Sequence, residues 1–145
     1  GGESLEFIGR RLLILASEDI GLANPNALLL AQSCFDSIRV IGNPESRIIL
    51  SQTVIYLACS PKSNSAYMAI IKAMDFVQKT GDLSIPLHLR NAPTRLMKDL
   101  HYGADYKYPH DFPGNFVAQN YFPEGYEKPN FYEPGDNPNE AKLKR

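Results

Sequence analysis

Apolar side chains recur at helical spacing near the start of the chain. The members of this first stripe share one face of a helix and are Leu5, Ile8, Leu12 and Leu15. Ser4 lies just before the stripe and Gly21 follows it. Because serine caps helix starts and glycine favours helix ends, the pattern predicts a helix over 4–17 with a stop at Gly21.

Three more helices are predicted before residue 82. Asn-Pro pairs at 24–25 and 43–44 resemble helix starts, because asparagine caps well and proline suits the first helical position. They predict helices from residue 25 to Gly42 and over 44–59. Ser63 or Asn64 caps the fourth helix, which stops at Thr80-Gly81. Residues 44–59 are apolar on nearly every side, so this helix is expected to be surrounded on most sides.

The second half of the chain loses this periodicity. Residues 82–91 are predicted to be irregular, and Asn91 is predicted to cap a short helix that ends at Leu100. Prolines and aromatic residues punctuate 104–134, which we expect to wrap around the helices with large anchoring side chains. The sequence thus predicts an all-α bundle over 3–103, a wrapping segment to 134, and a polar, frayed tail over 135–145. We interpret residues 1–2 as a cloning remnant.

Composition narrows the class of protein. The chain has 145 residues, of which 43% are hydrophobic and 21% charged, as in an ordinary globular domain. The net charge of −1 gives no overall attraction to nucleic acid or an anionic membrane. No apolar run is long enough to span a bilayer and no signal peptide opens the chain, so we expect a cytoplasmic protein without a membrane partner. Cys34 and Cys59 are interpreted as buried, reduced thiols.

The least generic stretch is Pro86–Pro113, which contains all three histidines, His88, His101 and His110. Aspartates at 99, 105 and 111 lie nearby, so a metal site is one interpretation. No histidine pair has the spacing of a helical metal motif, however, and no paired cysteines accompany them. Structural histidines with hydrogen-bond partners are therefore favoured over metal ligands.

Positive charge and tyrosines alternate in the same stretch. The candidates for contact with DNA are Arg95, Lys98 and Lys107, because single-strand binders combine such charges with aromatic faces. The neighbouring aspartates favour the alternative, in which the tyrosine-rich loops pack on the bundle without contact to DNA. Arg90 is expected to bond to backbone carbonyls or a carboxylate. There is no GxSxG or GxxxxGK[ST] sequence, so this segment is expected to have no catalysis and no ATP site of its own.

Three runs of sequence carry a family resemblance: SEDIGLANPNAL (17–28), VIYLACSPKSNSAY (54–67) and PLHLRNAPTRLMKDLHYGADYKYPHD (86–111). They resemble the C-terminal region of the replication-associated recombination protein A family. These bacterial AAA+ ATPases are also called MgsA and are related to the Werner-helicase-interacting protein of eukaryotes. The resemblance runs from about Leu5 to Tyr132. The family-motif positions, for which a structural or docking role is expected, are Pro61, Lys62, Ser63, Asn64, His88, Arg90, Asn91, Pro93 and Thr94.

The resemblance implies a fragment of a longer protein. In the family, a clamp-loader-like ATPase module with the ATP and magnesium site precedes this region. The region itself is similar to the helical oligomerisation domain of clamp loaders and assembles the protein, typically as a tetramer. The resemblance therefore implies a homotetramer, contact with the preceding ATPase module, and a role with DNA at replication forks, in the cytoplasm at the nucleoid. A DNA- or partner-docking module on the 86–113 surface remains the alternative.

Overall fold

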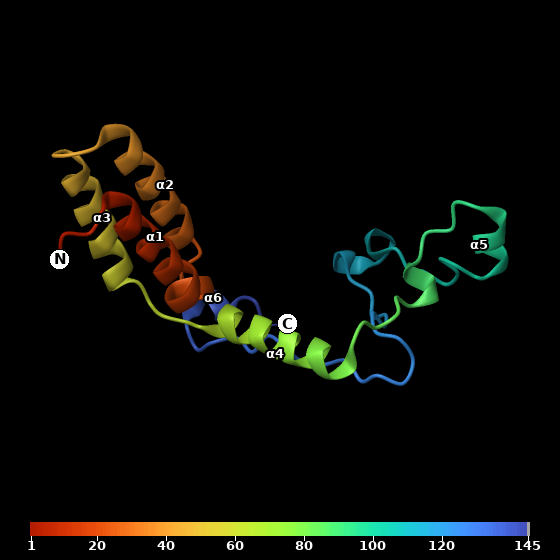
Figure 1. Cartoon of the computed structure of the whole chain (residues 1–145). Helices are drawn as coiled ribbons and strands as arrows, with labels where there is room; N and C mark the ends of the chain where they lie inside the picture. The colour runs from red at the N-terminus through yellow and green to blue at the C-terminus, as the bar shows by residue number, and fades with distance from the viewer. Residues whose placement is uncertain (145) are drawn as a thin grey trace. The chain divides into compact units, whose positions relative to one another are not determined.

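The computed structural model describes residues 1–144, and no strand occurs among them. Four long helices come first: α1 (Leu5–Leu15), α2 (Asn26–Ile41), α3 (Ser46–Cys59) and α4 (Ser65–Thr80). Two short ones follow, α5 (Arg95–Asp99) and α6 (Pro138–Ala141) (Figure 1). The prediction of an all-α fold with four helices before residue 82 is confirmed.

The chain forms two units. One comprises Gly1–Asp75 together with the described C-terminal segment from Phe131, and the other comprises Phe76–Asn130. The predicted boundaries, a bundle over 3–103 with a segment over 104–134 around it, are therefore wrong. Residues 104–130 group with 82–103 and with the end of α4, where the rings of Phe76 and Phe122 meet edge to face at 6.0 Å.

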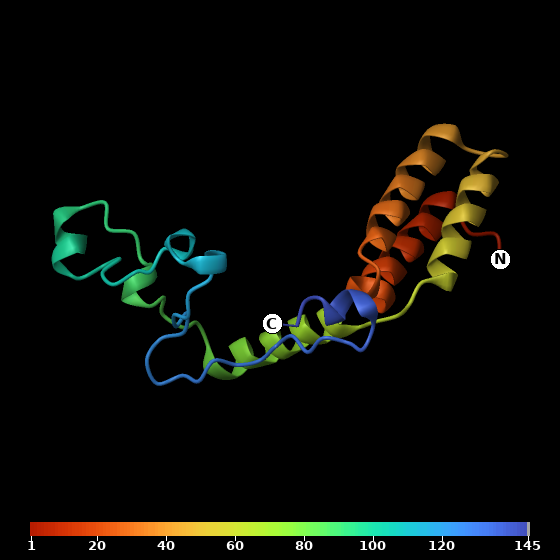
Figure 2. The ribbon, with the colours of Figure 1, turned by 180° about the vertical axis from the view of Figure 1, so that it is seen from behind.

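In the first unit, α1, α2 and α3 lie side by side (Figure 1), and Figure 2 shows the same arrangement from behind. Their shared core is small and rich in alanine: Ala16, Ile20, Ala27, Ala31 and Leu57. Small side chains let the helices approach closely, and Gly9 extends this contact. A methyl group added there would lie 2.6 Å from the ring of Phe35. The small residues of both helices thus allow α1 and α2 to pack closely.

The helix starts use their polar residues in two ways. Ser4 caps α1 as predicted, because its hydroxyl accepts a bond from the Phe7 N–H at 3.2 Å. Asn24 does not cap α2. Its side chain instead donates to the hydroxyls of Tyr56 at 3.0 Å and Ser60 at 3.1 Å, at the far end of α3. The sequence indicated a helix start at Asn24, but it did not show that the Asn24 side chain would bond to residues at the end of α3.

The end of the chain differs most from the expectation of a frayed tail. Asn137 caps α6 by accepting a bond from the Glu140 N–H at 2.9 Å, and Glu140 is completely buried. The side chain of Asn139 donates to the carbonyl of Ala23, which joins α6 to the turn after α1. Both views place α6 beside the start of α4 (Figures 1 and 2). The prediction is wrong because the polar groups of this segment find hydrogen-bond partners both within the segment and on the rest of the first unit.

Candidate functional site

The run Pro61–Asn64 joins α3 to α4 and has a structural role. The Lys62 ammonium donates to the carbonyls of Leu57 at 2.9 Å and Ser60 at 2.6 Å, so it binds carbonyl groups at the end of α3. The Ser63 N–H donates to the carbonyl of Asp19 at 2.8 Å. Pro61 and Asn64 are exposed. This run therefore connects three parts of the first unit.

Glu140 lies beside that run and is the most perturbed titratable group. Its Oε2 accepts bonds from the Ser65 hydroxyl at 2.6 Å, the Tyr132 hydroxyl at 2.9 Å and the Gly135 N–H at 2.9 Å. Its Oε1 accepts from the Asn137 amide at 2.8 Å. These donors surround the carboxylate on both oxygens.

The pKa of Glu140 reflects two opposing effects. Burial by itself raises the pKa. The hydrogen bonds from Ser63, Ser65, Gly135 and Asn137 lower it by a larger amount, so the resulting pKa is about 2. The pKa of Tyr132 is raised, first by burial and then by its bond to this carboxylate. The arrangement holds a fixed charge and offers no acid or base that titrates near neutral pH, so it is a structural clamp rather than a reactive centre.

In the second unit, Arg90 organises the segment after Pro86. Its Nε donates to the carbonyl of Ile85 at 2.7 Å and its Nη1 to the Tyr102 hydroxyl at 3.1 Å. The guanidinium also lies 5.1 Å from the centre of the Tyr102 ring. The prediction that Arg90 bonds to a backbone carbonyl is confirmed, and the arginine fastens residues 85 and 102 to each other.

The short helix α5 begins later than predicted. Its cap is Thr94, whose hydroxyl accepts a bond from the Met97 N–H at 3.2 Å, so the prediction of Asn91 as the cap is wrong. Thr94 has extended backbone angles that suit this position, whereas Pro93 intervenes after Asn91. Asn91 and Pro93 are exposed. The HLRNAPT run thus contributes one arginine clamp and one helix cap.

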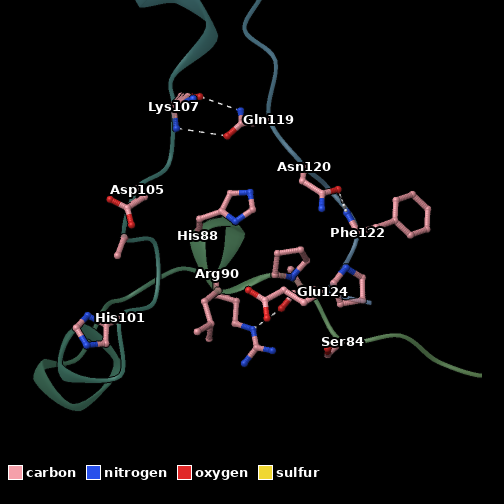
Figure 3. A pocket seen from close by; sticks show the side chains of 15 residues that line it. Ser84, His88, Arg90, His101, Asp105, Lys107, Gln119, Asn120, Phe122 and Glu124 are labelled. Atoms are coloured by element: carbon pink, nitrogen blue, oxygen red, sulfur yellow. Dashed lines mark hydrogen bonds between the residues drawn. The ribbon is translucent and has the colours of Figure 1, made fainter. Parts of the chain in front are cut away.

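An open pocket of about 630 Å³ lies within 84–124 of the second unit (Figure 3). Among the candidate residues, His88, Arg90, His101 and Lys107 line it, whereas Arg95 and Lys98 do not. Gln119 and Glu124 also line it, and Figure 3 shows Gln119 facing Lys107 and Glu124 beside Arg90. Neither residue had been identified from the sequence, because the tail around them has no periodic pattern that relates it to Pro86–Arg90.

The histidines do not converge on a metal. Among the described residues, no cluster of histidine, cysteine or acidic side chains has the geometry of a metal site. His88 and His101 line the pocket, but His110 packs against the ring of Tyr108 at 5.1 Å. His88 also departs from the expected structural histidine, because its Nε2 is buried and bonds to no described residue.

The cysteines differ from each other. Cys34 is buried on α2, as expected, but Cys59 at the end of α3 is exposed, so the prediction of two buried thiols is wrong for Cys59. None of the described helices combines the length and apolar character needed to cross a membrane.

Comparison with known proteins covers the whole sequence. Residues 1–145 match the family described as MgsA AAA+ ATPase C terminal. Replication-associated recombination protein A of Coxiella burnetii is 44% identical over 99% of this chain, and that of Escherichia coli is 39% identical over 99%. ATPase WRNIP1 of Dictyostelium discoideum is 41% identical over 88%. The chain spans 33%, 32% and 15% of these three relatives, respectively.

Proposed function

Because the chain belongs to the MgsA AAA+ ATPase C-terminal family, we propose that it is the assembly domain of a longer ATPase. The chain corresponds to about a third of the bacterial relatives, so the ATPase activity is assigned to the part of the protein outside it, together with ATP and magnesium. The relatives are named for replication-associated recombination. By that analogy we propose a role of the whole protein at replication forks, in the cytoplasm at the nucleoid.

The observation that carries the assembly proposal is the outward face of α3. Its inward face buries Ser46, Thr53 and Leu57. On the opposite face, Ile48 and Ile55 are spaced by two helical turns and are 72% and 61% exposed. The helix therefore presents an apolar stripe, interrupted by the exposed Ser51 and Gln52, that the rest of its own unit leaves uncovered. Exposed apolar surface of this kind on a small protein is typical of association surfaces.

A second copy of the chain is the occupant that we propose for this stripe. A closed homo-oligomer buries the same patch on every subunit, with two-fold symmetry as the commonest solution. The family resemblance favours a tetramer over a dimer. The exposed residues of α2, such as Leu29 at 70% and Val40 at 86%, supply further apolar surface for a second type of contact. Two different contacts are what a tetramer with two-fold symmetry requires.

Sedimentation equilibrium of the 145-residue chain tests this proposal. The expected mass is about four times the 16.2 kDa of one chain. The double variant Ile48→Asp, Ile55→Asp is expected to dissociate the tetramer. Each chain then carries two new aspartates, so a contact between two α3 helices would bury four negative charges. Each buried, unpaired charge costs several kcal/mol. Gln78→Asp, at an exposed position of α4 and outside both proposed contacts, is the control and should keep the wild-type mass.

Two outcomes would contradict the proposal. A monomer mass at every accessible concentration would remove self-assembly from this chain and assign it to the ATPase module. An unchanged tetramer in the double variant would remove α3 from the interface. Unfolding of the variant is not expected, because both isoleucines are mostly exposed, and circular dichroism checks this point.

A further inference from the structure

The second unit, residues 76–130, has no core of its own. No residue in this range is fully buried, whereas the first unit encloses Ile20 and Leu57 completely. Large apolar side chains of the second unit stay exposed, such as Leu96 at 67% and Phe116 at 62%. Ordering each residue costs conformational entropy, which the burial of apolar surface has to offset. The second unit therefore has much less to hold it closed than the first.

The hydrogen bonds that shape the second unit are few and mostly open to water. Arg90 donates to the Ile85 carbonyl and to the Tyr102 hydroxyl, and the Gln119 side chain donates to the Lys107 carbonyl. The bonds to Ile85 and Lys107 are exposed. Because water can replace either partner of an exposed bond, such bonds add little stability. They define the closed form without making it permanent.

Backbone strain is concentrated in the same unit. Three non-glycine residues of the described chain have a positive φ, and all three lie within 76–130: His101 at 62°, Asp105 at 64° and Asn115 at 53°. The left-handed region is less favourable for residues with a side chain than for glycine. Opening of the second unit releases this strain, so the strain favours the open form.

The first unit holds the chain on both sides of the second. The chain leaves the first unit along α4 and returns to it at Phe131. On the returning segment, Glu133 pairs with Lys72 of α4 at 2.9 Å, and Glu140 accepts a bond from Ser65 at 2.6 Å. Both ends of the second unit are thus fastened to one helix, so the chain between them can open while the first unit stays folded.

We infer that residues 76–130 form an order–disorder element, which opens and closes as one unit while the first unit and its C-terminal segment stay folded. The pocket within 84–124 exists only in the closed form. A ligand of this pocket therefore stabilises the closed form, and its apparent affinity falls as the open fraction rises. The assembly proposed for α3 does not use this unit, so either statement can fail without the other.

Hydrogen exchange of the 145-residue chain, followed by mass spectrometry, tests the inference. Peptides from 85–126 should exchange at least about a hundredfold faster than peptides from α2, because they open in a step that leaves α2 folded. Arg90→Ala should accelerate exchange in 85–126 at least about fivefold more and leave α2 unchanged, because it removes contacts of the closed form only. Arg95→Ala, at an exposed position of α5, is the matched control and should change neither rate.

Limited digestion with trypsin tests whether the ends stay fastened. The first cuts are expected in the second unit, after Arg90, Arg95 and Lys107. The fragment that ends at Arg90 and the fragment that begins after Lys107 should still elute together, because Glu140 joins them. Glu140→Gln should weaken this complex at least about tenfold. Glu133→Gln, which removes only a surface ion pair, should leave it nearly unchanged.

Four results would overturn the inference. Protection in 85–126 equal to that in α2, or faster exchange of α2 in Arg90→Ala, would show that the two units open together. An unchanged rate in 85–126 in that variant would show that the Arg90 contacts hold no closed form. Wild-type fragments that separate as soon as the chain is cut would show that the first unit does not hold both ends.

Discussion

Glu140 provides the sharpest test of the first unit. Glu140→Gln keeps the shape of the side chain but replaces one acceptor oxygen by an NH₂ group. Three donors converge on Oε2 and one on Oε1. Whichever way the new amide is oriented, its NH₂ group faces at least one of these donors, and a buried donor loses its partner.

The size of the effect follows from the pKa of the carboxyl group. Folding lowers the pKa of Glu140 from 4.5 to about 2. Each pH unit of difference between the folded and unfolded pKa is worth about 1.4 kcal/mol, so the ionised form stabilises the fold by about 3 kcal/mol relative to the protonated form. We expect Glu140→Gln to lower the free energy of unfolding at pH 7 by about 2–3 kcal/mol.

The pH dependence has a definite sign. Since the folded pKa is depressed, this stabilisation is fully present above about pH 4.5. It is lost progressively as the pH falls towards 2, where the folded carboxyl group also takes up its proton. In the Gln variant, this part of the acid destabilisation should be absent.

Urea unfolding between pH 7 and pH 3 measures both effects. Glu133→Gln is the matched control, because Glu133 belongs to the same C-terminal segment but is 68% exposed and forms a surface ion pair with Lys72 at 2.9 Å. An exposed pair of this kind contributes less than about 1 kcal/mol. If Glu140→Gln unfolded at the same urea concentration as the wild type, the C-terminal segment could not be docked through this carboxylate, and the reasoning would be refuted.

Two further predictions concern single contacts. Arg90→Ala should lower the free energy of unfolding by about 1–3 kcal/mol, because the Ile85 carbonyl and the Tyr102 hydroxyl lose their donor, and an unchanged melting midpoint would contradict the clamp. Gly9→Ala should destabilise the first unit by about 1–3 kcal/mol through overpacking, since the new methyl group would lie 2.6 Å from Phe35. Differential scanning calorimetry measures the effect of Gly9→Ala. A melting midpoint at or above that of the wild type would contradict the prediction, because the Phe35 ring would then move aside without cost.

The four long helices were predictable because each has a recognisable start and stop around a long apolar segment, which forms a stripe in α1, α2 and α4 and covers nearly every side of α3. Even the clamp at Arg90 could be anticipated, since a segment fenced by prolines leaves carbonyls that a guanidinium can satisfy. The buried carboxylate of Glu140 could not. Glutamate is almost never fully buried, and its partners Ser65 and Tyr132 lie 75 and 8 residues away in the sequence, where no periodic pattern relates them to it.

The pocket around His88 was hidden for the same reason. Its walls come from irregular chain on both sides of α5, and irregular segments carry no sequence period from which their neighbours can be deduced. The three histidines attracted attention as a group, yet only His88 and His101 share the pocket. Proximity in sequence was therefore a poor guide to which of these side chains act together.

The burial of α3 has a more useful consequence. Its sequence is apolar on nearly every side and predicted a helix that is surrounded on most sides, and within a single chain Ile48 and Ile55 face outward. A helix that needed to be buried only on the side of Leu57 could carry polar residues at both positions at no cost to the fold. Apolar residues there instead lower solubility unless a partner covers them. The isoleucines that a single chain leaves uncovered on α3 are thus the strongest argument that the chain acts in an assembly.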